Sequence, residues 1–183
     1  MLEIEAKFPV SDHGEVQHQL RAWGAHFDEE REDADQYFNA PDRDFARTDE
    51  ALRVRSIGPA NLVTYKGPKT EAQTKTRTEI EVPLAAGAVM AEEFGRLLVH
   101  LGYRPVAVVH KRRTIAHLKR DGFDLEISLD NVDEVGRFVE VEILAPAEAL
   151  EAARKVLLKV AADLGLKGQE RRSYLEMLLA NRQ

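Results

Sequence analysis

Carboxylates in this sequence recur in pairs whose members lie two residues apart. The pairs are Glu3 and Glu5, Glu79 and Glu81, and Glu140 and Glu142. Because successive side chains of a β-strand point to opposite faces, both members of a pair project from one face. Clustered carboxylates supply the hard oxygen ligands that Mg²⁺ and Mn²⁺ prefer. The spacing therefore predicts carboxylate faces able to bind a divalent cation.

Basic side chains follow the same spacing. Arg53 and Arg55 are two residues apart, as are Lys111 and Arg113. The same parity places Arg77 on one face with Glu79 and Glu81, and Asp130 on one face with Glu126 and Ser128. Lys and Arg bind phosphate oxygens and stabilise the charge that moves during phosphoryl or nucleotidyl transfer. Acidic and basic strand faces together favour a site for a metal-bound polyphosphate.

Periodicity indicates which elements position these residues. Alternating or short apolar runs predict strands at 2–8, 25–39 (interrupted), 51–57, 62–66, 75–82, 106–116, 123–130 and 138–144. Apolar residues at helical spacing predict helices after Ser11 or Asp12 as far as Trp23, and at about 91–101, 146–164 and 173–179. The dipeptide Asp121-Gly122 is typical of a two-residue hairpin, so neighbouring strands should run antiparallel. The class is α+β.

Two arrangements would accommodate a strand with one apolar and one charged face. In an open sheet, the charged face would be exposed to water and carry cross-strand ion pairs. In a closed eight-stranded antiparallel barrel with helices packed on the outside, that face would line a lumen. Charges of both signs in a lumen must pair or meet a ligand, and a polyphosphate with divalent cations neutralises both. We expect the closed barrel, as one domain over residues 1–183.

Composition excludes several classes of protein. The 183 residues include no cysteine, which removes disulfides, thiolate metal sites and a cysteine nucleophile. The net charge of -6 disfavours a nucleic-acid binder. Neither a membrane-spanning apolar run nor a signal peptide is present, so we expect no membrane partner and a cytoplasmic location. The histidines show no metal-binding spacing, which disfavours a zinc site.

Read in order, the charged segments resemble the CYTH superfamily, the triphosphate tunnel metalloenzymes. The family signature is an E-x-E-x-K strand at the extreme N-terminus, which reads Glu3-Ile4-Glu5-Ala6-Lys7 here. Further matching segments are Leu52-Arg53-Val54-Arg55, Tyr65-Lys66-Gly67-Pro68, Arg77-Thr78-Glu79-Ile80-Glu81, Lys111-Arg112-Arg113, Leu129-Asp130, Gly136 to Glu142, and Arg172-Ser173-Tyr174-Leu175. Within the superfamily, the chain is most similar to the class IV adenylyl cyclases.

The resemblance implies roles for individual residues. The metal-side carboxylates would be Glu3, Glu5, Asp130, Glu140 and Glu142, with Glu81 in support. The substrate-binding residues would be Arg53, Arg55, Lys66, Arg77, Lys111 and Arg113, of which Lys111 and Arg113 would also be catalytic together with Glu5 and Lys7. The implied cofactor is Mg²⁺ or Mn²⁺. Relatives of this length often dimerise, so a homodimer is a further implication.

Three functions stay open at this point. A class IV cyclase would bind ATP, and the ribose 3′-hydroxyl would attack the α-phosphorus with pyrophosphate leaving. A triphosphatase of the same fold would direct water at the terminal phosphorus of thiamine triphosphate or inorganic triphosphate. A non-catalytic module would only bind polyphosphate or nucleotide. We expect the cyclase, although no motif identifies an adenine pocket. Tyr174 lies at helical spacing with Leu175 and Leu178, which predicts a packing role.

Overall fold

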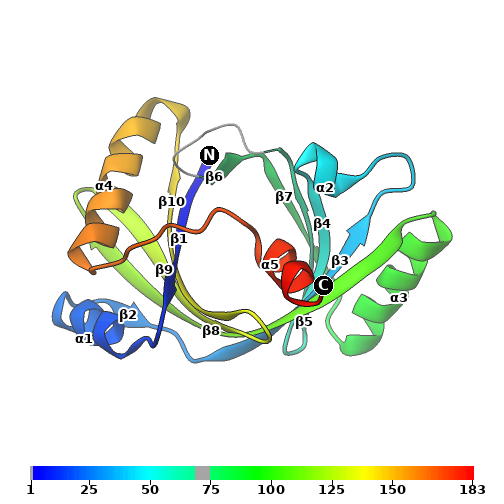
Figure 1. Ribbon diagram of the computed structural model, residues 1–183, viewed down its shortest axis with the longest axis horizontal. Coiled ribbons are helices and arrows are strands. Elements are labelled where there is room, and N and C mark those ends of the chain that lie inside the picture. Colours follow the sequence, from blue (N-terminus) through cyan, green and yellow to red (C-terminus); the bar gives the residue numbers. More distant parts are fainter. Residues whose placement is uncertain (1, 69–74) are drawn as a thin grey trace.

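One antiparallel sheet, curled into a half-barrel with helices on its outside, organises the protein (Figure 1). The computed structural model describes residues 2–68 and 75–183, and only the backbone of residues 75–77. The strands are β1 (Leu2–Val10), β2 (His26–Phe27), β3 (Arg31–Asn39), β4 (Ala51–Ile57), β5 (Ala60–Lys66), β6 (Lys75–Arg77), β7 (Glu79–Leu84), β8 (Arg104–Arg120), β9 (Phe123–Val132) and β10 (Gly136–Ala145). Their spatial order is β6-β1-β10-β9-β8-β3-β4-β5-β7, and β2 pairs with β8. All strand pairs are antiparallel, as predicted.

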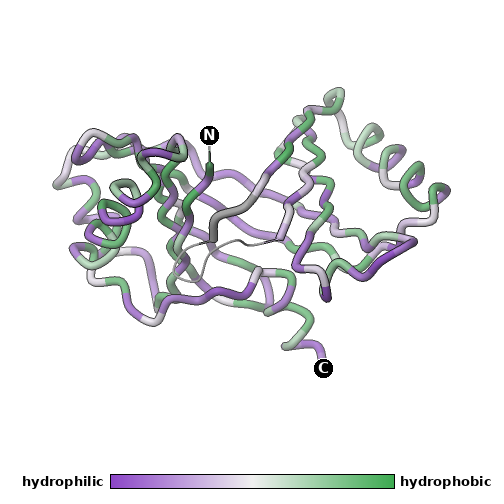
Figure 2. Tube along the Cα trace, turned by 90° about the horizontal axis from the view of Figure 1, so that it is seen from above, coloured by the Kyte–Doolittle hydropathy of each residue, from purple (hydrophilic) through white to green (hydrophobic). Residues whose placement is uncertain are grey.

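Helices cover the two walls of the sheet separately. The helices are α1 (Gly14–Ala22), α2 (Phe45–Thr48), α3 (Ala88–His100), α4 (Leu150–Asp163), which follows the short 3₁₀ helix η1 (Ala147–Ala149), and α5 (Tyr174–Asn181). Helices α1 and α4 pack with β1, β8, β9 and β10 around one core, and α3 packs on β3, β4 and β5 around another. Figure 1 shows α5 between the walls, α1 and α4 at one end of the molecule and α3 at the other, and the view from above in Figure 2 shows helical turns at these two ends. No helix in these described ranges is long and apolar enough to cross a membrane.

Strand β1 illustrates how the sequence determines the two faces. Ile4 and Ala6 are at most 1% exposed and belong to the core beneath α1 and α4. Glu5 and Lys7, on the opposite face, line the space inside the curl. The alternation predicted for residues 2–8 is therefore confirmed, and the charged face is inside the curl and not on the outer surface.

The expectation of a closed barrel was wrong. The eight longer strands form a curled sheet, but the path through its hydrogen-bonded neighbours has two ends, at β6 and β7. The predicted strand at 75–82 is interrupted at Thr78: residues 75–77 pair with β1, whereas 79–84 pair with β5. In the described residues, β6 pairs only with β1 and β7 only with β5, and no ladder joins β6 to β7. The sheet is therefore open along this line.

The connection between β3 and β4 contains a helix that the sequence did not predict. Helix α2 has four residues, and Asp44 caps it by accepting a hydrogen bond from Ala46 N. Asn39 Oδ1 accepts from Phe45 N at 2.8 Å, which fixes the entry to the helix. These short-range hydrogen bonds hold the connection at one mouth of the curl.

Candidate functional site

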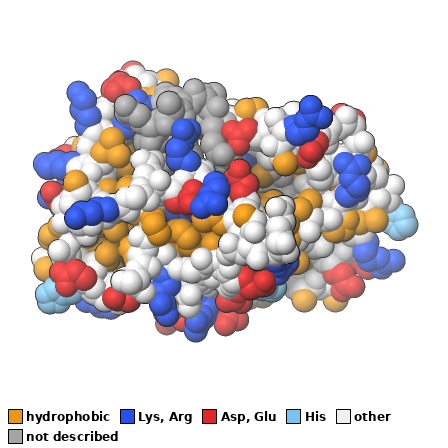
Figure 3. Space-filling model, in the orientation of Figure 1, with side chains coloured by type: hydrophobic (Ala, Val, Ile, Leu, Met, Phe, Trp, Pro, Cys, Tyr) orange, Lys and Arg blue, Asp and Glu red, His pale blue; other side chains and the backbone are white. Residues whose placement is uncertain are grey.

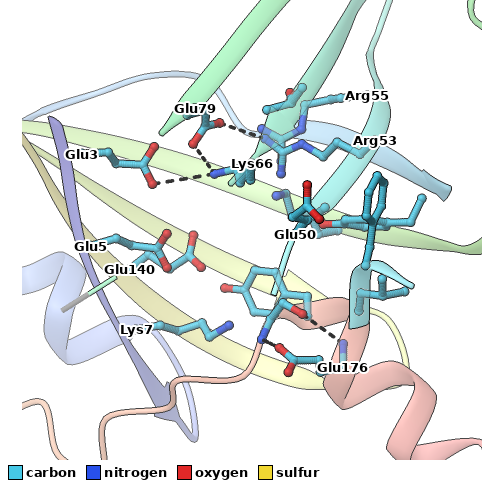
Figure 4. Close-up of a pocket in the computed structure, with 18 of the residues that line it drawn as sticks. Glu3, Glu5, Lys7, Glu50, Arg53, Arg55, Lys66, Glu79, Glu140 and Glu176 are labelled. Carbon is cyan, nitrogen blue, oxygen red and sulfur yellow. Dashed lines mark hydrogen bonds and ion pairs between the residues drawn. The ribbon is translucent and has the colours of Figure 1, made fainter. Parts of the chain in front are cut away.

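A cavity of about 610 Å³ lies inside the curl of the sheet. Figure 4 shows the carboxylates of Glu3, Glu5 and Glu140 on one side, opposite the basic side chains of Lys66 and Arg53. On the face drawn in Figure 3, acidic and basic side chains gather near the centre, over the space between the two walls. The open sheet therefore still encloses a charged interior.

One wall of the cavity is acidic. Cross-strand pairing places Glu126 opposite Glu142 and Glu142 opposite Glu5, which forms a row of carboxylates across β9, β10 and β1. Burial, together with the charges of Glu5 and Glu126, raises the pKa of Glu142 to about 7. Burial and a hydrogen bond with Glu79 raise the pKa of Glu3 to about 9, although Lys66 opposes the shift. In this acid wall, defined as Glu3, Glu5, Glu126 and Glu142, burial and repulsion between carboxylates outweigh the charge of Lys66 at Glu3 and Glu142.

Lys66 bridges the acid wall to β7. Its Nζ lies 2.5 Å from Glu79 Oε2 and 3.7 Å from Glu3 Oε1. Burial opposes ionisation of Glu79, but Glu3 and Lys66 lower its pKa below the usual value. Arg53 reaches the same region, with Nη2 at 3.9 Å from Glu79 Oε1. Lys66 and Arg53 thus both line the cavity.

The opposite wall is built around Asp35, which is 1% exposed. Its carboxylate accepts two hydrogen bonds from Arg55, at 2.6 and 2.8 Å, and lies 3.5 Å from Lys111 Nζ and 3.6 Å from Arg53 Nη1. Burial opposes ionisation, but Lys111, Arg53 and Arg55 together hold the pKa of Asp35 well below its usual range. We call Asp35, Arg53, Arg55 and Lys111 the Asp35 cluster. It presents three cations around Asp35, and a second buried carboxylate, Asp33, lies 3.9 Å from Arg55 Nε and 3.8 Å from Lys111 Nζ.

Arg113 connects this wall to the carboxylates of β9 and β10. Its Nε donates to Asp130 Oδ1 at 2.6 Å, and its Nη2 donates to Glu140 Oε2 at 2.6 Å. Tyr174 Oη donates to Asp130 Oδ2 at 2.7 Å. Burial opposes ionisation, yet Arg113 lowers the pKa of Asp130 to about 2. Two of the predicted metal-side carboxylates are thus paired with a predicted phosphate-binding arginine.

Lys7 lines the cavity but is engaged by the C-terminal segment. Its Nζ donates to the carbonyl oxygen of Arg172 at 2.5 Å and lies 4.0 Å from the ring centroid of Tyr174. Glu170 N donates to the carbonyl oxygen of Lys7 at 2.8 Å. The segment 170–174 therefore holds Lys7 from both its backbone and its side chain.

Sequence reasoning missed several residues of the site. Arg31, Asp33 and Asp35 point to one face of β3, and Arg31 Nε lies 3.0 Å from Asp33 Oδ1. Their spacing of two residues could have indicated that they share one face of a strand. That inference requires the start of β3 to be predicted correctly. Of the predicted residues, Arg77 pairs through its backbone with Glu3, and its side chain lies outside the described residues.

A curled antiparallel sheet with acidic and basic walls facing one interior defines a class of protein built to surround a highly charged ligand. The CYTH domain model matches residues 1–174. The chain therefore belongs to the CYTH family, and its resemblance to the class IV adenylyl cyclases is confirmed.

Relatives and solved structures agree with this assignment. A Methanocaldococcus jannaschii protein provisionally named an adenylate cyclase is 37% identical over 97% of this chain and 98% of its own. The Aeromonas hydrophila adenylate cyclase CyaB is 29% identical over 94% of this chain and 86% of its own. The PH1819 protein of Pyrococcus horikoshii superposes with a TM-score of 0.86 at 34% identity, over 98% of this chain and 99% of that one.

A more distant structure shares the fold. A Hippeastrum protein provisionally named an adenylyl cyclase, and described as having a dominant triphosphatase activity, superposes with a TM-score of 0.65 at 14% identity. The alignment covers 98% of this chain and 95% of that one.

Enzymes of the CYTH family generally use a divalent metal, and the acid wall fits one by donor chemistry. Its carboxylates are hard oxygen donors, and the raised pKa values of Glu3 and Glu142 arise from burial and repulsion that a cation would relieve. In the ranges that the structure describes, no three or more acidic or histidine side chains already converge as a metal site. The donors are therefore present in one wall without a converged geometry.

Proposed function

We propose that this protein is a metal-dependent enzyme acting on a triphosphate, and specifically a class IV adenylyl cyclase that converts ATP to cyclic AMP and pyrophosphate. The observation that carries the proposal is the cavity itself, in which an acid wall faces the Asp35 cluster and Arg113. Such an interior is complementary to a metal-bound polyphosphate and to few other ligands.

The residues would divide the work by charge. Glu3, Glu5 and Glu142 would hold Mg²⁺ or Mn²⁺, which supplies positive charge to the phosphates, and Asp130 and Glu140 would join them once Arg113 turns to the substrate. Arg53, Arg55, Lys66, Lys111 and Arg77 would bind phosphate oxygens. In the reaction, the 3′-oxygen forms a bond to the α-phosphorus and gives up its proton to water as the bond to the pyrophosphate oxygen breaks. Lys111 and Arg113 would stabilise the charge that accumulates during this step.

An adenine base requires an apolar surface beside the phosphate path. The cavity extends to the mouth formed by α2, the start of β8 and α5, where Phe45, Val106, Leu175 and Leu179 line it. Val106 is 39% exposed, so its side chain is accessible from this mouth. We assign the base to this surface, which a triphosphatase acting on inorganic triphosphate would not need.

The test is product identification. The purified protein is incubated with ATP, thiamine triphosphate or inorganic triphosphate, each with Mg²⁺ or Mn²⁺, and the products are separated by chromatography. We expect cyclic AMP and pyrophosphate from ATP. Glu5→Gln should abolish turnover without unfolding the protein, whereas the control Glu92→Gln, at an exposed position of α3, should leave turnover unchanged.

Other products would revise the proposal in defined ways. Phosphate released from inorganic or thiamine triphosphate, with no cyclic product, would identify a triphosphatase. Tight binding of triphosphate without any product would identify a binding module. Full activity of Glu5→Gln would contradict the assignment of the acid wall as the metal side.

A further inference from the structure

We infer that Tyr174 is a positioning residue of this site, which holds Lys7 and Asp130 in the geometry that the reaction requires. The inference rests on the proposed function, which assigns Lys7 and Asp130 to the reaction. The contacts of Tyr174 show how it would hold these two side chains. It differs from the packing role that the sequence predicts for this side chain.

Tyr174 is held firmly at the start of α5. Ser173 Oγ accepts a hydrogen bond from Glu176 N at 3.1 Å, and Glu176 Oε2 accepts from Ser173 N at 2.5 Å, which completes a capping box. The tyrosine that follows is 6% exposed. Its backbone therefore begins a capped helix, and its side chain points into the cavity from a fixed point.

The side chain of Tyr174 contacts charged groups from three strands of the cavity. The hydroxyl donates to Asp130 Oδ2 at 2.7 Å on β9. The ring centroid lies 4.0 Å from Lys7 Nζ on β1 and 5.7 Å from Lys111 Nζ on β8. The aromatic face attracts the lysine ammonium groups, whereas the hydroxyl satisfies the carboxylate that Arg113 also binds.

These contacts separate positioning from packing. Tyr174 also packs against Phe138, with ring centroids 5.2 Å apart, beside Met177 and Leu178. Packing requires only the ring. Orientation of Asp130 requires the hydroxyl, since loss of this donor leaves Asp130 Oδ2 to Arg113 alone and allows the Arg113–Asp130 pair to rotate. Replacement of Tyr174 by phenylalanine therefore removes only the hydroxyl, whereas replacement by leucine removes both the hydroxyl and the aromatic ring.

Steady-state kinetics on the full chain test the inference. Tyr174→Phe keeps the ring and should lower kcat about tenfold while KM changes less than threefold, because the substrate-binding cations remain. Tyr174→Leu also loses the aromatic face toward Lys7 and should lower kcat roughly a hundredfold. The control Met177→Leu, in the same helix and the same cluster, should leave both parameters unchanged. A Tyr174→Phe protein with kcat within twofold of the wild type would overturn the inference.

A second measurement does not depend on turnover. In a lysine-labelled sample, the Lys7 Hε signal should show an upfield ring-current shift that Tyr174→Phe retains and Tyr174→Leu reduces to the part due to Phe138, whose ring centroid lies 5.7 Å from Lys7 Nζ. Binding of inorganic triphosphate by calorimetry should weaken at least fivefold in Tyr174→Leu. If the wild type turns over no triphosphate, the proposed function fails, and these two readouts still decide the inference: an unchanged Lys7 signal or an unchanged affinity in Tyr174→Leu refutes it.

Discussion

Replacement of Asp35 by asparagine tests whether the basic wall is held together by one buried anion. Asp35→Asn keeps the size of the side chain and removes its charge. Arg53, Arg55 and Lys111, which are at most 9% exposed, would then surround a neutral amide, and Asp33, at 3.8 to 3.9 Å, would be the nearest carboxylate left to Arg55 and Lys111. Removal of one partner from a buried ion pair costs about 3–5 kcal/mol, because it leaves uncompensated buried charge.

For a chain of this length, each kcal/mol lowers the melting temperature by roughly 2–4 °C, so Asp35→Asn should melt on the order of 10 °C below the wild type. The assay is thermal unfolding in metal-free buffer, followed by circular dichroism. Inorganic triphosphate should stabilise the variant more than the wild type, because the three cations gain an anion that no longer competes with the carboxylate of residue 35.

The control is Glu81→Gln. Glu81 has a side chain that is 45% exposed, and it lies 3.8 Å from Arg53 Nη2, so its loss should cost less than about 1 kcal/mol. A melting temperature of Asp35→Asn within 2 °C of the wild type would refute the reasoning, since the cations would then need no buried counter-ion.

Three further predictions follow from the acid wall, Lys111 and the apolar mouth. At pH values between the usual carboxylate pKa and about 7, folded Glu142 holds a proton that the unfolded chain releases. The free energy of unfolding of the metal-free wild type should therefore fall by up to about 3 kcal/mol as pH rises through this window. Thermal unfolding with EDTA at pH 5 and pH 8 should show a smaller loss of stability between the two pH values for Glu142→Gln than for the wild type. An equal loss in both proteins would contradict the assignment. Burial and Arg113 lower the pKa of Lys111 to about 8, so calorimetric binding of metal-free triphosphate should weaken up to about tenfold more from pH 7 to pH 9 in the wild type than in Lys111→Arg, and equal weakening in both would contradict the role of Lys111. Leu179→Ala should raise KM for ATP about tenfold and leave KM for inorganic triphosphate within twofold, and parallel changes would place the base elsewhere.

Strand parity was sufficient to predict which residues share the interior. The expected pairs Glu3 and Glu5, and Glu140 and Glu142, lie on the inner face because a period of two is a local property of the backbone. Register was not predictable in the same way. The bonds from Arg113 to Asp130 and Glu140 depend on how β8, β9 and β10 align, which is set by turns and by the whole sheet.

The start of β3 shows a different limit. Arg31, Asp33 and Asp35 lie in an acidic stretch that reads as solvent-exposed from composition alone. In the structure, Asp33 and Asp35 are at most 2% exposed, because Arg31, Arg55 and Lys111 come from three strands to neutralise them. A buried carboxylate is recognisable only together with its partners, and these partners are up to 78 positions away in the sequence, as for Lys111 and Asp33.

The two walls differ in how fully they are neutralised, and the difference indicates what each would bind. On the basic side, Asp35 and Asp130 have lowered pKa values, which means that enough cations surround them. On the acid wall, Glu3 and Glu142 have raised pKa values, because burial and mutual repulsion outweigh the charge of Lys66. A cation would therefore gain most at the acid wall, whereas a phosphate must compete with Asp35 and Asp130 for their arginines. This asymmetry implies that metal strengthens triphosphate binding by drawing the ligand toward the acid wall, where no internal anion has to be displaced.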